Sequence, residues 1–249
     1  MIYLSQIKSG LNSKTENFIR EPFLGFSKET IDFLRKLKNR KYNNKKWFDN
    51  NRDMYETFVK IPMRALIDTL YIELKKIDDN IIVGYKSIFR INRDIRFAKD
   101  KTPYKTQTSA SFCYNTIKKS ELPQFYFHLS PDEFLIAGGQ YDKNPAILKK
   151  IRNEILRNFD EYKSIITDKR FVKEYKNIEG EKLKRFPKGY EILEKSCSEE
   201  LLAESLKMKQ YYVYKTYQPE VALKPDLTEL ITYHIGLMNP FMKFISRCL

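Results

Sequence analysis

A block with the texture of β-strands in the middle of the chain, from Gly84 to Tyr141, places the strongest constraint on the fold. Apolar and polar side chains alternate through much of it, which is the two-residue period of a strand. A Ser-Pro-Asp turn predicts that the runs on either side of it form an antiparallel hairpin. We predict a meander of about four strands, at Ser87–Phe97, Gln107–Tyr114, Gln124–Leu129 and Glu133–Ile136, the last continuing toward Gly138.

Helical periodicity lies on both sides of this block. Before it, apolar residues recur at helical spacing from Ser27 to about Arg40, from Lys46 onward, and from Met63 to about Lys76. After it, further helices are predicted from Pro145, from Ser198 to about Tyr217, and from Asp226. Helices segregated around a contiguous antiparallel sheet indicate the α+β class, with the helices packed on one face of the sheet.

The chain has 249 residues, 42% of them hydrophobic, which is enough for a substantial core. No stretch has the composition of a linker, so we predict a single α+β domain over residues 22–249. Residues 1–21 lack a firm pattern and are predicted to form an N-terminal arm.

The stretch Lys86–Thr106 is the densest run of mixed charge, with seven Lys or Arg residues and two Asp. As a strand, it would place core residues on one face and a polar row on the other. Neighbours in that row would lie about 7 Å apart, a spacing that suits guanidinium groups clamping phosphate or carboxylate oxygens. The polar row consists of Arg90, Asn92, Asp94 and Arg96, and the core face of Phe89, Ile91, Ile95 and Phe97.

Arg93 would fall on the apolar face, where a guanidinium needs a partner. Asp100 is one candidate partner, and a β-bulge that turns Arg93 to the polar side is the alternative. The loop that follows, with Lys101, Tyr104 and Lys105, is expected to close over the bound anion.

A second basic loop, Leu183–Tyr190, would complete the pocket with Lys184 and Arg185 if it folds back over the sheet. The alternative is a solvated loop. Tyr141, after the Gly138–Gly139 pair, is placed near the same site. The two glycines permit a bulge or a close backbone approach.

His128 shares the polar face of its strand with Tyr126, and it is the best candidate for a general base. An ordinary cross-strand hydrogen bond is the competing interpretation. Asp94 and Tyr104 are the other candidates for moving a proton. No nucleophile–histidine arrangement, metal-ligand spacing or nucleotide-binding loop is visible, so no metal or cofactor is predicted and enzymatic activity stays open. The second histidine, His234, lies in an apolar helical run and is predicted to be structural.

The central stretch, FRINRDIRFAKDKTPYKT, resembles the hallmark of uncharacterised bacterial and fungal proteins grouped as domain of unknown function 2461. Its core can be written RDxRFxxDKxPYK. Other blocks resemble the family too, and the resemblance runs from about Pro22 to Phe244. It implies no reaction, cofactor or catalytic residue, and it favours a shared purpose for the basic stretch. The other blocks are FLGF, KWFDNN, FYFHL, GGQY and LKRFPKGY.

The formal net charge of +14 favours anionic partners, although lysine, asparagine and isoleucine are abundant throughout, as an AT-rich genome would produce. The three cysteines are far apart, which fits a reducing compartment. No apolar run approaches a membrane span, and we therefore expect a cytoplasmic protein with no membrane partner. The oligomeric state is not indicated.

Three functional hypotheses follow. The first is an anionic small-molecule ligand, bearing phosphate or carboxylate, in a basic pocket on the polar face of the sheet. The second is nucleic-acid binding by basic loops and aromatic side chains, among them the tyrosines at 211, 212, 214 and 217, which otherwise pack in their predicted helix. The third is a non-catalytic scaffold in which the charged stretch is a structural ion-pair network.

Overall fold

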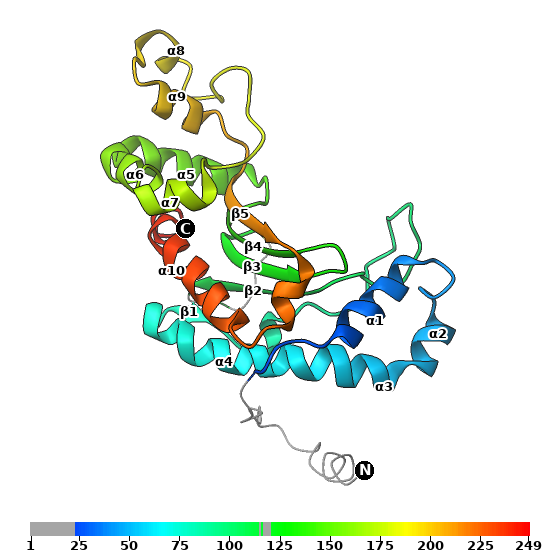
Figure 1. Ribbon diagram of the computed structural model, residues 1–249. Coiled ribbons are helices and arrows are strands. Elements are labelled where there is room, and N and C mark those ends of the chain that lie inside the picture. Colours follow the sequence, from blue (N-terminus) through cyan, green and yellow to red (C-terminus); the bar gives the residue numbers. More distant parts are fainter. Residues whose placement is uncertain (1–22, 115, 117–120) are drawn as a thin grey trace.

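The computed structural model describes residues 23–114, 116 and 121–249, so the predicted arm at 1–21 lies outside the described residues. It contains a five-stranded antiparallel sheet in the order β1-β2-β3-β4-β5 (Figure 1). The predicted α+β class is confirmed, whereas the single domain over residues 22–249 stays a prediction. The strands are β1 (Ile81–Ile82), β2 (Thr108–Tyr114), β3 (Gln124–Leu129), β4 (Phe134–Gln140) and β5 (Tyr211–Tyr217).

Helices flank the sheet in both sequence and space. The first group is α1 (Lys28–Lys38), α2 (Lys45–Asn50), α3 (Arg52–Tyr55) and α4 (Ile61–Ile77), with a π-helical turn at Glu56–Lys60. The second group is α5 (Pro145–Arg157), α6 (Phe159–Ile166), α7 (Lys169–Tyr175), α8 (Leu193–Ser196), α9 (Glu200–Leu206) and α10 (Leu227–Ser246). No helix in the described part of the chain is both long and apolar enough to span a bilayer.

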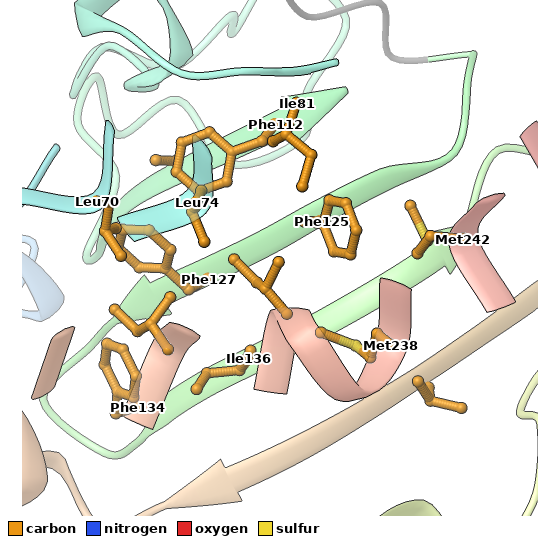
Figure 2. Close-up of a cluster of buried hydrophobic side chains, with 14 of the residues drawn as sticks. Leu70, Leu74, Ile81, Phe112, Phe125, Phe127, Phe134, Ile136, Met238 and Met242 are labelled. Atoms are coloured by element: carbon orange, nitrogen blue, oxygen red, sulfur yellow. The ribbon is translucent and has the colours of Figure 1, made fainter. Parts of the chain in front are cut away.

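The core lies between one face of the sheet and helices α4 and α10. Figure 2 shows aromatic and aliphatic side chains of the sheet meeting those of the two helices. Gly138 brings α10 close to β4, because a Cβ at that position would lie 2.8 Å from the sulfur of Met238. The close approach allowed by this glycine is therefore confirmed. The core residues labelled in the figure are Leu70 and Leu74 (α4), Ile81 (β1), Phe112 (β2), Phe125 and Phe127 (β3), Phe134 and Ile136 (β4), and Met238 and Met242 (α10).

The predicted strand at Ser87–Phe97 is wrong: this segment forms only isolated bridges, Ile88 to Ala110 and Asn92 to Tyr104. Its backbone still forms separate hydrogen bonds with residues 103–109. We call the segment 88–107 the basic hairpin. The ladder breaks because Arg90 alone opposes three residues, 106–108, between the Phe89–Ser109 and Ile91–Lys105 hydrogen bonds. An unequal count of this kind disrupts strand pairing, as in a bulge.

The predicted helix from Ser198 to about Tyr217 is also wrong beyond Leu206. The buried Arg152 side chain donates to the carbonyl oxygens of Leu206 (2.8 Å) and Met208 (2.6 Å), which fixes a turn at this point. The sequence that follows, YYVYKTY, is rich in the aromatic and β-branched residues that favour strands. It pairs with β4 along its length as β5.

His234 on α10 is fully buried, and both of its ring nitrogens are hydrogen-bonded. The hydroxyl of Tyr175 lies 2.7 Å from Nδ1, and that of Tyr217 lies 2.6 Å from Nε2. The histidine therefore joins α10 to α7 and β5, in agreement with its predicted structural role. Burial lowers the pKa of His234 to about 4.

We expect the stability of the fold to decrease as pH falls from about 6.5 to about 4. In this window the unfolded chain binds a proton at His234 that the folded chain excludes. This difference lowers the free energy of unfolding by roughly 3 kcal/mol across the window. Above this window the stability is fully present. Urea unfolding at a series of pH values measures the effect. His234→Gln should be less stable at neutral pH but lose most of this pH dependence, and an equally steep dependence in the variant would contradict the assignment.

Candidate functional site

A hollow of about 610 Å³ lies between the C-terminal end of α1 and the basic hairpin. We call it the basic hollow, because four cationic side chains and two carboxylates line it. The charged residues of its wall are Lys38, Arg40, Arg93, Lys105, Asp94 and Asp100; the others are Leu37, Asn43, Thr102, Tyr104, Thr106 and Gln107.

Asn43 attaches the hairpin to the end of α1. Its side-chain amide donates to the carbonyl oxygens of Leu37 (2.7 Å) and Tyr104 (3.0 Å), and its oxygen accepts from the Tyr104 amide (3.0 Å). The Tyr104 ring stacks on Phe48 with centroids 4.0 Å apart. Burial raises the pKa of Tyr104. Tyr104 was a candidate for proton transfer, and these contacts give its ring and backbone a structural role.

Arg93 and Asp100 form an ion pair at 2.5 Å, so the predicted partner of Arg93 is confirmed. Asp100 also accepts from the hydroxyl (2.8 Å) and amide (3.2 Å) of Thr102. The pKa of Asp100 is lowered to about 2, chiefly by the hydrogen bond from Arg93 and next by those from Thr102. The three side chains therefore close one end of the hairpin through internal contacts.

Two further cations of the hairpin are also bound to neighbouring protein groups. Arg96 makes a two-point contact with Asp94, at 3.0 Å and 2.7 Å, and both side chains are exposed. Lys101 donates to the carbonyl oxygen of Ile95 at 3.0 Å. Phe97, which was expected on the core face, is 95% exposed. These residues, at the tip of the basic hairpin, do not form the continuous polar row that a regular strand would give.

The side chains of Arg90 and Lys105, like that of the exposed Lys99, have no salt bridge or hydrogen bond within the described residues. Arg90 is exposed, and Lys105 is half-buried with its ammonium group 5.0 Å from the centre of the Phe89 ring. Burial, and next the charge of Arg90, lower the pKa of Lys105. Two neighbouring cations that repel each other, one of them partly removed from water, are a pattern typical of anion sites. Arg90 also acts on a carboxylate, because it adds to the effect of Arg96 in lowering the pKa of Asp94.

The second basic loop does not reach this hollow. Its backbone is joined to the turn after α9 through Leu183, and the Tyr190 hydroxyl bonds Asn153 of α5 at 2.5 Å. Figure 1 shows this yellow segment at the far end of the molecule from the teal hairpin beside α1. Lys184 and Arg185 are exposed there and do not line the basic hollow.

A second hollow, of about 520 Å³, lies on the sheet face opposite the core. We call it the tyrosine trough. His128 and Tyr141 line it, together with Tyr212 and Tyr214 of β5, which the sequence analysis assigned to a helix. Gln107 lines both hollows. The remaining residues of the trough are Leu122, Gln124, Tyr126, Leu135, Ala137, Gly138 and Gly139.

His128 is buried, and its Nε2 lies 3.2 Å from a carboxylate oxygen of Glu133. Burial lowers the pKa of His128 more than Glu133 raises it, which favours the neutral ring with Nε2 as the donor. The hydrogen bond is to the turn after β3 and not across strands. Within the described residues, Nδ1 is buried without a partner, and no group of three or more His, Cys, Asp or Glu could hold a metal ion.

A family described as "Conserved hypothetical protein (DUF2461)" matches residues 29–244. No curated protein and no solved structure matches the chain.

We expect Phe97→Ala to change the free energy of unfolding by less than about 0.5 kcal/mol, because the exposed ring loses almost no buried surface. Ile91→Ala, in the same hairpin at 7% exposure, should cost about 2–5 kcal/mol. Urea unfolding of the two variants provides the comparison. A large loss for Phe97→Ala would contradict its placement at an exposed tip.

Proposed function

The chain belongs to the DUF2461 family, whose description assigns no reaction, and from this starting point we propose that the basic hollow binds a small ligand bearing a phosphate or a carboxylate. The unpaired cations Lys105 and Arg90 carry the proposal. The ligand would supply the negative charge that Asp100 supplies to Arg93 and Asp94 supplies to Arg96.

Lys105 is the central residue of this proposal, because it lines the hollow and is half-buried. A charge-assisted hydrogen bond to an anion is stronger when the group is removed from water. Arg90 is exposed and is not among the described lining residues, and it would add a second positive charge close to Lys105. Arg93, Asp100 and Thr102 would act indirectly, by fixing the hairpin that holds Lys105 in place.

Nucleic-acid binding is the second candidate, and the exposed tip of the hairpin favours it. Phe97 projects there beside the exposed Arg96 and Lys99, and an aromatic ring among cations is a stacking platform for bases. The pairing of Arg96 with Asp94 reduces the positive charge that this tip offers to phosphates, and we therefore rank this function second.

We also propose a cytoplasmic location. The three cysteines, Cys113, Cys197 and Cys248, are all unpaired, and free thiols are usual in reducing compartments.

We predict that inorganic phosphate binds the protein and that Lys105→Ala weakens this binding about tenfold or more, the usual value of a hydrogen bond to a charged group. Arg90→Ala should weaken it less, because Arg90 is exposed. Lys99→Ala is the matched control: it removes the same charge from an exposed position outside the hollow and should leave the affinity nearly unchanged. Calorimetric titration measures all four proteins.

Equal effects of Lys105→Ala and Lys99→Ala would contradict a defined site and favour attraction by overall charge. The salt dependence separates the two functions. Binding of a single-stranded oligonucleotide by phosphate contacts weakens steeply with ionic strength, whereas binding of one small anion depends on it less. Steep salt dependence together with loss of oligonucleotide binding in Phe97→Ala would favour the second candidate.

The pH dependence gives a further expectation. Lys105 must be protonated to hold an anion, so the affinity should fall as pH rises through its pKa. Because this pKa is lowered, the fall should occur at a lower pH than it would for an ordinary lysine. Sulfate is the suitable probe, since its charge is constant over this range. Arg90→Ala removes a repelling charge and should move the midpoint upward. A midpoint that does not move would show that Arg90 does not act on Lys105.

A further inference from the structure

The tyrosine trough is built by the register of three neighbouring strands. Ala137 of β4 pairs with Tyr126 of β3 on one side and with Tyr214 of β5 on the other. Gly139, two residues further along β4, pairs with Tyr212 of β5. Small residues of β4 therefore form the floor, and tyrosines of the flanking strands form the walls.

The dimensions and chemistry of the trough fit a flat ring. The backbones of β3 and β5 lie about 10 Å apart, two strand spacings, which leaves room for one ring between the walls. Its volume of about 520 Å³ is within the range of small-molecule sites. Among the described residues that line it there is no Lys, Arg, Asp or Glu, and burial lowers the pKa of His128, so this surface favours an uncharged aromatic group.

The trough and the basic hollow are adjacent. Gln107 lines both, and its amide donates to the Tyr126 hydroxyl at 2.9 Å. The Phe89 ring packs edge-on against Tyr126, with centroids 6.1 Å apart, and lies 5.0 Å from the Lys105 ammonium group. One short row of side chains therefore connects the cation of the first hollow with the wall of the second.

We propose that one ligand occupies both hollows, with its phosphate or carboxylate at Lys105 and Arg90 and a flat aromatic ring in the tyrosine trough. This inference rests on the proposed function and specifies its ligand as an aromatic phosphate or an aromatic acid. The separation of charges supports it, since cationic side chains line the basic hollow, whereas tyrosines, with no described cation among them, line the trough that shares Gln107 with it.

The experiment compares three probes by calorimetric titration: inorganic phosphate, phenyl phosphate and phenol. Phenyl phosphate should bind the wild-type protein at least tenfold more tightly than inorganic phosphate. Ala137→Phe fills the trough and should abolish this gain while leaving the affinity for inorganic phosphate unchanged. Thr216→Phe is the matched control, because Thr216 is an exposed residue on the same face of β5 that does not line the trough, and it should keep the gain.

Tyr214→Ala provides a second variant if Ala137→Phe folds poorly, because its side chain is 45% exposed and its loss should cost little stability. It should reduce the gain severalfold. Equal affinities for phenyl phosphate and inorganic phosphate, or a gain that survives both trough variants, would overturn the two-part ligand and leave the proposed function intact. Failure of inorganic phosphate to bind would overturn the proposed function. A second result in that case would be binding of phenol by the wild-type protein, with Ala137→Phe losing this binding. This result would mean that the trough binds a ring by itself, and it would also overturn the two-part ligand.

Discussion

The packing of α4 and α10 against a single face of the sheet sets which surfaces of the sheet are buried. Gly138 lets Met238 of α10 lie directly on β4, and phenylalanines of the sheet fill the space below. This one-sided burial provides the hydrophobic free energy of the core. On the opposite face of β3, β4 and β5, the described residues Tyr126, Tyr212 and Tyr214 line the tyrosine trough instead of a packed core.

The charges of the basic hairpin are divided between structure and a proposed site. Asp100 and Asp94 neutralise Arg93 and Arg96, and Lys101 binds backbone carbonyl oxygens, so the scaffold interpretation describes these groups well. Exposed pairs of this kind add little stability, but several together restrict the conformation of a hairpin that lacks a regular ladder. Of the cations that these contacts leave over, Lys86 and Lys99 are exposed like ordinary surface lysines, whereas Lys105 is half-buried beside Arg90 and is not explained by a scaffold.

The sequence predicted those features that depend on local pattern. Strands β2 and β3 were found from their composition and alternation, and β4 from the Ser-Pro-Asp turn that precedes it. The Arg93–Asp100 pair lies within one short segment. The segment 87–97 alternates equally well, but its partner carries extra residues opposite Arg90, which no pattern within 87–97 reveals. β5 was missed because its tyrosines point to both faces of the sheet and so lack a two-residue period. The distant position of Lys184 and Arg185 depends on the contacts of Tyr190 with α5, a tertiary relation.

The placement of Lys105 follows from these constraints taken together. Asn43 holds the backbone of Tyr104, the residue just before it, and Phe89 supports its side chain from the other arm of the hairpin. A cation held in this way, partly removed from water and repelled by Arg90, is less stable than a free lysine, as its lowered pKa indicates. An anion bound there, as proposed, would offset both penalties at once without reorganising the hairpin. Because the fold already fixes the charge, the proposed binding would carry a small ordering cost, and this preorganisation would separate such a site from a mobile surface lysine.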